Sequence, residues 1–234
     1  MSKSNKSHKK DKAVVGGSVK LIVLFRNWAH QGFTYLDRTE MFYRVIWELV
    51  PFCIIFYLFV LTGISWWCNI VLSFLLAHTL NWVLNDNMWT CIQFTLPNLL
   101  NPGNEKTKLY LVEMQKRMQN NKAVGGCMIY GSMSRGVWKN KSDLDIRILR
   151  KPGILNGFKG YWACWVERLI AVRNKQPLDI YLADSIDFLK KMRDDEFPIF
   201  LKGNDKRLVE VYGNFQIADF TNIDSLNELA RSCH

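Results

Sequence analysis

Hydrophobic positions run almost without interruption from residue 45 to residue 84, and Glu48 is the only Asp, Glu, Lys or Arg in that stretch. About forty residues are too many for one membrane-spanning helix and suit two. Residues 62–65 (Thr-Gly-Ile-Ser) offer a turn, so the pattern predicts one helix over 45–61 and another over 66–84. Each helix would reach roughly 25–30 Å, close to the thickness of a hydrocarbon core.

Tryptophan marks both ends of this hairpin. Trp66 and Trp67 lie at its tip, and Trp47, Trp82 and Trp89 lie near its base, a two-level placement typical of membrane proteins. We therefore expect the hairpin to span a bilayer. Two other interpretations stay open: a re-entrant hairpin, which the proline of the first helix would suit, and a helical hairpin buried in a soluble protein.

Charge differs between the flanks of the hairpin and its turn. The turn carries none, whereas Lys and Arg are frequent on both flanks. The positive-inside rule then places both termini, and the domain that follows the hairpin, in the cytoplasm. The flanking residues are Lys3, Lys6, Lys9, Lys10, Lys12, Lys20, Arg26, Arg38 and Arg44 before the hairpin, and Lys106, Lys108, Lys116 and Arg117 after it.

Composition and periodicity divide the whole chain into five segments. They are a basic, disordered tail over 1–18, a membrane-associated helical region over 19–96 (with an interfacial helix over 19–25), a linker over 97–104, an α/β domain over 105–213, and a C-terminal helix or tail over 214–234. The hairpin therefore precedes a domain of a different class.

Within the 105–213 domain, helical and alternating patterns follow one another. They predict helices over 105–121, 161–173 and 185–193, strands over 124–130, 143–149, 177–182 and 207–212, and a terminal helix over 225–232. Asp184 is the expected N-cap of the 185–193 helix. The expected fold class is an α/β (α+β) domain with a small mixed sheet, preceded by a transmembrane or re-entrant hairpin.

The chemistry is concentrated around the first two strands. Gly131 follows the first strand and lets the backbone approach a phosphate, Ser132 offers a hydroxyl and an N–H group, and Arg135 can bind the same anion. Asp143 and Asp145 then open the second strand, and their i, i+2 spacing places both carboxylates on one face. A divalent cation, Mg²⁺ by its preference for oxygen ligands, would relieve their repulsion.

A third carboxylate belongs to the same chemistry. Asp179 lies mid-strand between Leu178 and Ile180, where an unpaired acid is costly. A role as metal ligand or as base for an attacking hydroxyl would explain it. Asp184 is a rival for this role and ranks lower, because a helix N-cap is needed at its position.

Three motifs follow one another along the chain: Tyr-Gly-Ser-x-x-x-Arg-Gly, Ser-Asp-x-Asp and a later isolated Asp within a strand. In this order they resemble the DNA polymerase β-type nucleotidyltransferase superfamily, and its minimal nucleotidyltransferase members in particular. The resemblance covers roughly residues 105–213 and does not extend to the apolar N-terminal half.

The resemblance implies a reaction and a set of roles. Asp143, Asp145 and Asp179 would be catalytic and would bind Mg²⁺, with two ions expected and Mn²⁺ as a substitute. Gly131, Ser132, Arg135 and Ser142 would bind an NTP such as ATP. An acceptor would attack the α-phosphorus, and pyrophosphate would leave.

Partners beyond the NTP are less defined by the sequence. The formal net charge of +10, from 31 Lys and Arg against 21 Asp and Glu, favours an anionic partner: a nucleotide, a nucleic acid or an acidic bilayer. Nucleic acid is not favoured, because no nucleic-acid-binding module accompanies the motif. The oligomeric state stays open. A basic rim formed by Lys139, Lys141, Arg147, Arg150 and Lys151 could meet any of these anions or only solvent.

A polar stripe interrupts the second apolar helix. His78, Asn81 and Asn85 share one helix face, and Glu48 lies at a similar depth in the first helix. These four residues either bond one another and lock the hairpin or form a pocket for a lipid-linked acceptor.

The expected function is a membrane-anchored, metal-dependent nucleotidyltransferase whose acceptor is a lipid- or glycan-linked hydroxyl or phosphate. The alternatives are an enzyme that transfers AMP to protein hydroxyls, a catalytically silent membrane scaffold or nucleotide sensor, and a hairpin that serves oligomerisation alone.

Overall fold

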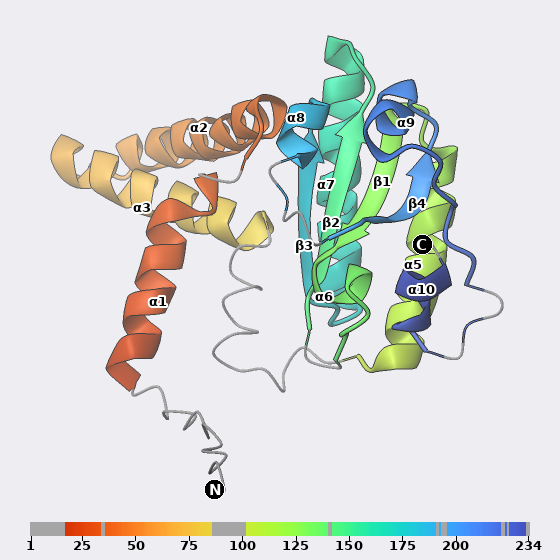
Figure 1. Cartoon of the computed structure of the whole chain (residues 1–234). Helices are drawn as coiled ribbons and strands as arrows, with labels where there is room; N and C mark the ends of the chain where they lie inside the picture. Colours follow the sequence, from red (N-terminus) through yellow and green to blue (C-terminus); the bar gives the residue numbers. More distant parts are fainter. Residues whose placement is uncertain are drawn as a thin grey trace, which may run out of the picture.

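The computed structural model describes residues 17–33, 36–85, 102–139, 142–190, 192, 196–220, 223 and 225–232. An N-terminal group of helices stands beside a mixed α/β domain (Figure 1). The expectations for residues 1–16 and 86–101, which include most of the tail and most of the linker, lie outside the described residues.

In the described residues before the domain, the helices are α1 (Gly17–His30), α2 (Arg38–Val60) and α3 (Trp66–Leu84). The hairpin of α2 and α3 agrees with the apolar pattern, and both helices are long and apolar enough to cross a membrane. The first begins at Arg38, earlier than the expected 45, because the Asp37 carboxylate caps it by accepting the Arg38 N–H at 2.8 Å.

The domain alternates helices and strands along the chain. Its elements are α5 (Asn104–Asn120), β1 (Val124–Tyr130), α6 (Gly131–Ser134), β2 (Leu144–Arg150), α7 (Ile154–Arg173), β3 (Leu178–Ala183), α8 (Ile186–Leu189), β4 (Ile199–Gly203), α9 (Lys206–Tyr212) and α10 (Glu228–Ser232).

The four strands form one sheet in the order β3-β2-β1-β4. Strands β2 and β3 are parallel and joined through α7, whereas β1 pairs antiparallel with both β2 and β4. The expected small mixed sheet is therefore confirmed.

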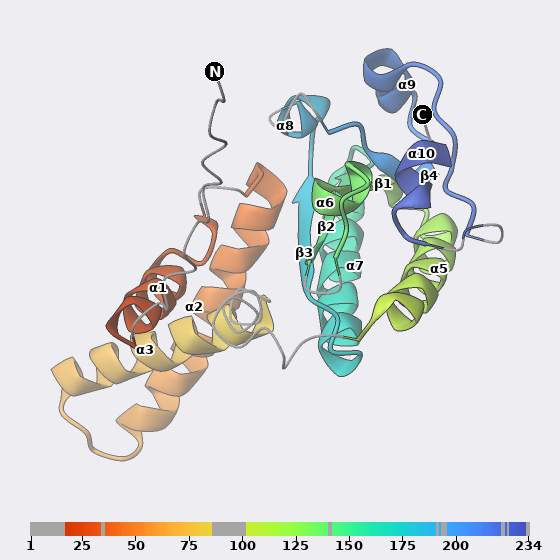
Figure 2. The same cartoon turned by 60° about the horizontal axis from the view of Figure 1, so that its bottom comes forward.

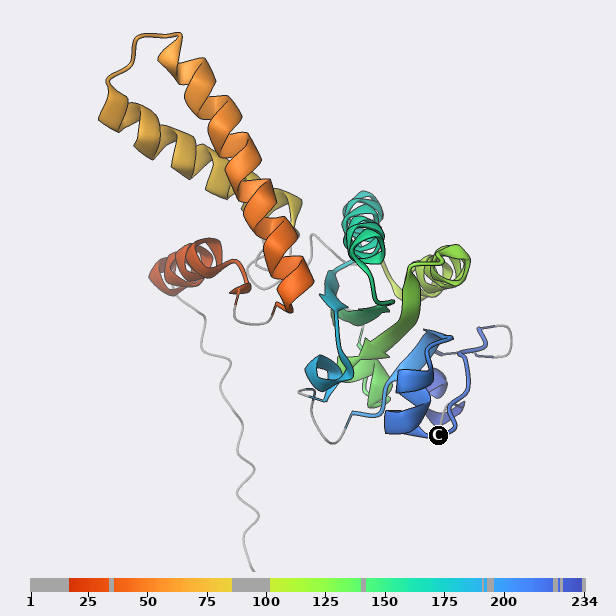
Figure 3. The ribbon, with the colours of Figure 1, turned by 90° about the horizontal axis from the view of Figure 1, so that it is seen from above.

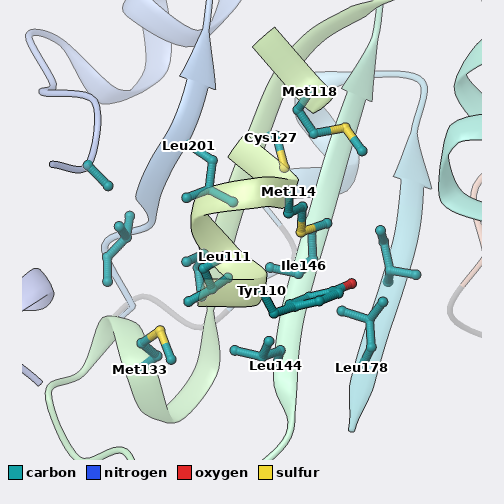
Figure 4. Close-up of a cluster of buried hydrophobic side chains, with 14 of the residues drawn as sticks. Tyr110, Leu111, Met114, Met118, Cys127, Met133, Leu144, Ile146, Leu178 and Leu201 are labelled. Atoms are coloured by element: carbon teal, nitrogen blue, oxygen red, sulfur yellow. The ribbon is translucent and has the colours of Figure 1, made fainter. Parts of the chain in front are cut away.

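Helices α5 and α7 cover one face of this sheet, and α8 and α9 lie over the other (Figures 2 and 3). Figure 4 shows Leu111 and Met114 on α5, which lies in front of the strands that carry Cys127 and Ile146. Side chains alternate along β2, so Leu144, Ile146 and Ile148 enter this core while the intervening residues point to the opposite face. The C-terminal segment packs into the same core through Phe220, Ile223, Leu226 and Leu229.

Three local predictions differ from the structure. The expected strand at 207–212 is helix α9, because the Asp205 carboxylate accepts the Arg207 N–H at 3.0 Å and starts a helix. Strand β4 was not among the predicted strands. The expected helix over 185–193 is reduced to the single turn α8, and Asp184 does not cap it.

Asp184 instead fastens the sheet to the hairpin. Its Oδ2 accepts the Thr39 N–H at 2.8 Å, and Asp37 Oδ2 accepts the Asp184 N–H at 2.8 Å. Two aspartates thus exchange caps between the end of β3 and the start of α2. Arg150 donates to Asp184 Oδ1 at 2.5 Å and neutralises the charge there.

A buried ion cluster completes the junction. Glu40 Oε1 accepts from Arg44 Nη2 at 2.7 Å and from Arg168 Nη2 at 2.5 Å, and Glu40 Oε2 accepts the Leu182 N–H at 2.7 Å. Arg168 also donates to the Ile180 carbonyl at 2.7 Å. Because these groups are buried and mutually satisfied, α2 is held firmly against the edge strand β3.

Candidate functional site

The sheet register brings two of the predicted carboxylates together. Asp145 of β2 is the direct neighbour of Asp179 in the parallel strand β3, and it pairs with Tyr130 at the end of β1 on its other side. Asp143 immediately precedes β2. All three carboxylates therefore gather beside the turn that follows β1, on the strand faces that do not enter the α5–α7 core.

Gly131 is required at that turn for two reasons. Its φ of +73° lies in the left-handed region, and a Cβ built there would overlap Asp145 Oδ2. The glycine thus lets the backbone of the turn lie directly against the carboxylate. The two halves of the predicted motif, separated in sequence, form one site in space.

Ser132 and Arg135 lie in and just after α6. The Ser132 hydroxyl is buried and has no hydrogen-bond partner among the described residues. Arg135 is paired with Glu196, whose Oε2 also accepts the Gly131 N–H at 3.3 Å. Glu196 thus places a carboxylate of the chain itself against the N–H and the guanidinium that the motif assigns to a phosphate.

Ser142 has a local partner in the structure. Its hydroxyl accepts the Lys139 N–H at 3.2 Å, and its own N–H donates to the Lys139 carbonyl at 2.8 Å. These two bonds close the turn that leads into Asp143. The assignment of Ser142 to nucleotide binding stays a prediction.

Arg147 supplies positive charge to the carboxylates. It is buried in β2 and donates to Asp179 Oδ2 at 3.1 Å and to the Asp179 carbonyl at 3.0 Å. Its placement on an exposed basic rim was therefore wrong. Arg147 lies two residues after Asp145 in β2, so both side chains share one face of the strand. The same i, i+2 spacing in the sequence could have indicated this position of Arg147.

The carboxylates remain crowded in spite of this arginine. Burial, followed by the negative charges of Asp143 and Asp179, raises the pKa of Asp145 to about 7. Burial also raises the pKa of Asp143. A bound cation would favour the ionised forms, and carboxylate oxygens are the donors that a divalent cation such as Mg²⁺ prefers.

The cluster is not a preformed cage. Within the described part of the chain, no three His, Cys, Asp or Glu side chains are already arranged as metal ligands. Arg147 takes one Asp179 oxygen in this structure. The residues that could hold a metal are Asp143, Asp145 and Asp179.

The polar stripe of the hairpin joins helices. His78 Nδ1 is 2.8 Å from Glu48 Oε1, His78 Nε2 donates to the Trp28 carbonyl at 3.0 Å, and Asn81 donates to Glu48 Oε2 at 2.6 Å. Asn85 accepts from Tyr161 at 3.1 Å and from Arg168 at 3.3 Å, and it donates to Asn81. The role of these residues as an acceptor pocket stays a prediction.

Known proteins add no further information on this site: no family model, no curated protein and no solved structure matches the chain.

Sequence reasoning missed Glu196. This residue lies far along the chain from the turn it contacts, between the short α8 and β4. No local pattern links it to Gly131, and β4 itself was not predicted.

Proposed function

We propose that the chain is a membrane-anchored nucleotidyltransferase, which moves a nucleoside monophosphate from an NTP to an acceptor hydroxyl or phosphate and releases pyrophosphate. One observation carries the proposal: the register of β1, β2 and β3 gathers Asp145, Asp179 and the Gly131 turn at one place. The four-stranded mixed sheet, with its Gly-Ser turn after β1, supports a nucleotidyltransferase-like fold for the domain.

Each group in the site has a task in this reaction. The Gly131 N–H and the Ser132 hydroxyl would bind phosphate oxygens, and Arg135 would exchange Glu196 for the triphosphate. Asp143, Asp145 and Asp179 would hold Mg²⁺ or Mn²⁺, which would neutralise the developing charge on the phosphates and the leaving group. The chain's own contribution is to orient the triphosphate for in-line attack.

The hairpin supports the membrane anchor through an inside-out pattern. The buried residues of α2 are the charged Glu40 and Arg44, and those of α3 include Asn69, Ser73 and Asn81, whereas most large apolar side chains of both helices are exposed. An exposed apolar surface of this extent is typical of a helix pair in lipid rather than in water. We propose that the hairpin is inserted in the bilayer with both termini in the cytoplasm.

The test is pyrophosphate release by the full chain in detergent, with each of the four NTPs, Mg²⁺ and a total membrane lipid extract. We expect release with the native chain and a loss of about 10³-fold or more with Asp143→Asn or Asp145→Asn. Glu113→Gln, an acid-to-amide change at an exposed pair with Lys116, is the matched control and should leave the rate unchanged.

The acceptor is identified by where the label of an α-³²P-labelled NTP appears. Label in the lipid extract indicates a lipid-linked acceptor, and label on polypeptide indicates AMP transfer to protein. Nucleotide binding without pyrophosphate release under any condition would contradict the enzyme and support a nucleotide sensor.

A further inference from the structure

Helix α7 is apolar on the side that faces away from the sheet. Ile154, Leu155, Phe158 and Trp162 are 89%, 74%, 51% and 46% exposed, and Leu169 is also exposed. At 3.6 residues per turn these five positions fall within an arc of about 100°. The buried side of the same helix, which includes Gly157, Gly160 and Cys164, packs on the sheet. Phe158 contacts Tyr43 of α2 along one border of the stripe, with ring centroids 5.9 Å apart, and yet it remains half exposed.

Such a stripe is unusual for a domain helix in water. A surface helix normally presents charged residues on its outer face. The exposed charges of α7 are Lys159 and Arg173, because Glu167 and Arg168 are buried. Large apolar residues with basic residues beside them are the composition of helices that lie in the interface of an anionic bilayer.

The stripe is continuous with the hairpin. The ring of Trp47 in α2 stacks on Trp165 of α7 with centroids 5.4 Å apart, and Trp165 stacks on Trp162 at 5.0 Å. This ladder of tryptophans leads from the apolar surface of α2 onto the outward face of α7. Tryptophan is the residue that favours the headgroup level of a membrane.

The orientation of α7 is that of a helix lying along a membrane surface. Figure 3 shows α7 end-on beside the base of the hairpin, while the hairpin extends across the view and away from the sheet. Figure 1 shows the same relation from the side, with α7 upright and α2 lying roughly horizontal to its left. If α2 and α3 cross the bilayer, α7 lies parallel to its surface and at its edge.

A cavity of about 480 Å³ opens between α2 and α7 at this level. Phe42, Tyr43 and Ile154 contribute apolar walls, and Arg38 and Arg150 contribute positive charge. Arg150 is engaged by Asp184, whereas the Arg38 side chain is exposed. The cavity thus combines cations and apolar surface where phospholipid headgroups would meet the junction.

We propose that the outward face of α7 lies in the headgroup layer of an anionic bilayer, as a second, in-plane membrane element beside the hairpin. This proposal rests on the insertion of the hairpin and does not require nucleotidyl transfer. It has a consequence for the site: the carboxylates point to the face of the sheet opposite α7, so they open to the aqueous side. An acceptor group must then project from the membrane or approach from water.

The experiment places the photo-crosslinking amino acid p-benzoylphenylalanine at one position at a time in the full chain. The protein is reconstituted in vesicles of equal parts phosphatidylcholine and phosphatidylglycerol and is irradiated. Lipid adducts are then detected by mass spectrometry. The test positions are Leu155 and Phe158. Leu58 of α2, which is 53% exposed, reports hairpin insertion, and Val209 of α9, which is 51% exposed, is the matched control outside the stripe.

We expect lipid adducts at 155 and 158 in yields within about twofold of position 58 and about tenfold or more above position 209. Adducts at 58 together with yields at 155 and 158 no higher than at 209 would overturn the proposal and leave the anchored hairpin intact. Adducts to a second copy of the chain at 155 and 158 would also overturn it. Absence of lipid adducts at position 58 would overturn both the insertion of the hairpin and the proposal.

Discussion

Two clusters of charged side chains share strand β3, and their charges are balanced in opposite ways. At the hairpin junction a single carboxylate, Glu40, meets two guanidinium groups and a backbone N–H. At the candidate site three carboxylates meet a single guanidinium, that of Arg147. A fully satisfied cluster holds structure together, whereas an excess of like charge raises the pKa of a carboxyl group and disfavours its ionised form.

The largest effect on stability is expected at the junction. Glu40→Ala leaves Arg44 and Arg168 buried without their carboxylate, which costs about 3–5 kcal/mol. We expect a strongly lowered midpoint of thermal unfolding for the full chain in detergent. Glu40→Gln keeps an acceptor oxygen and should lower the unfolding midpoint less. The glutamine variant therefore still tests the prediction if the alanine variant does not fold.

Glu113→Gln is the control for that change. Its carboxylate pairs with Lys116 at the surface, so the unfolding midpoint should stay at the native value. An unchanged midpoint in both Glu40 variants would show that the junction does not hold the hairpin to the domain.

The opposite response is expected at the carboxylate cluster. The pKa of Asp145 is raised to about 7, so its stabilising contribution is fully present below about pH 4 and is lost as the pH rises through 7. At pH 8 in EDTA, Asp145→Asn removes the crowded charge and should raise the unfolding midpoint by about 2–4 °C. The same variant should lose nucleotidyl transfer.

Added Mg²⁺ sharpens this contrast. It should raise the unfolding midpoint of the native chain more at pH 8 than at pH 5.5, because protons no longer compete for the carboxylates. It should have little effect on Asp145→Asn. If Asp145→Asn lowers the unfolding midpoint at pH 8, as Glu40→Gln is expected to do, the carboxylate cluster is a structural network. That result would disprove a cation site there.

The contrast also shows what the sequence could and could not predict. Helix α3 and strand β1 have the predicted bounds, because each is a strong local pattern ended by its own turn residues. Strand periodicity predicted a shared face for Asp143 and Asp145; Asp143 lies just before β2 and is close enough to raise the pKa of Asp145. Local patterns therefore indicated most elements and the composition of the site.

Long-range pairing was beyond such patterns. Asp184 looked like a helix cap and instead caps α2, far away in sequence. Arg147 looked like a surface cation and is buried against Asp179. In each case the partner is set by which strands become neighbours, and one sequence does not encode that register in a short window.

The smallest expected effect concerns Glu196, the carboxylate that lies against the Gly131 turn. In the proposed function this native anion would compete with the triphosphate, so only the fraction of molecules with Glu196 displaced would bind nucleotide. Glu196→Gln keeps the size of the side chain and removes the competing charge. We expect the Kd for NTP to fall by about threefold to tenfold, measured by equilibrium titration of the full chain. Asp187→Asn, at an exposed acid of α8 that pairs with Lys190, is the control and should leave the Kd unchanged. A weaker affinity in Glu196→Gln would mean that this carboxylate belongs with the satisfied charges of the junction, as a structural partner of Arg135, and that the turn does not exchange it for phosphate.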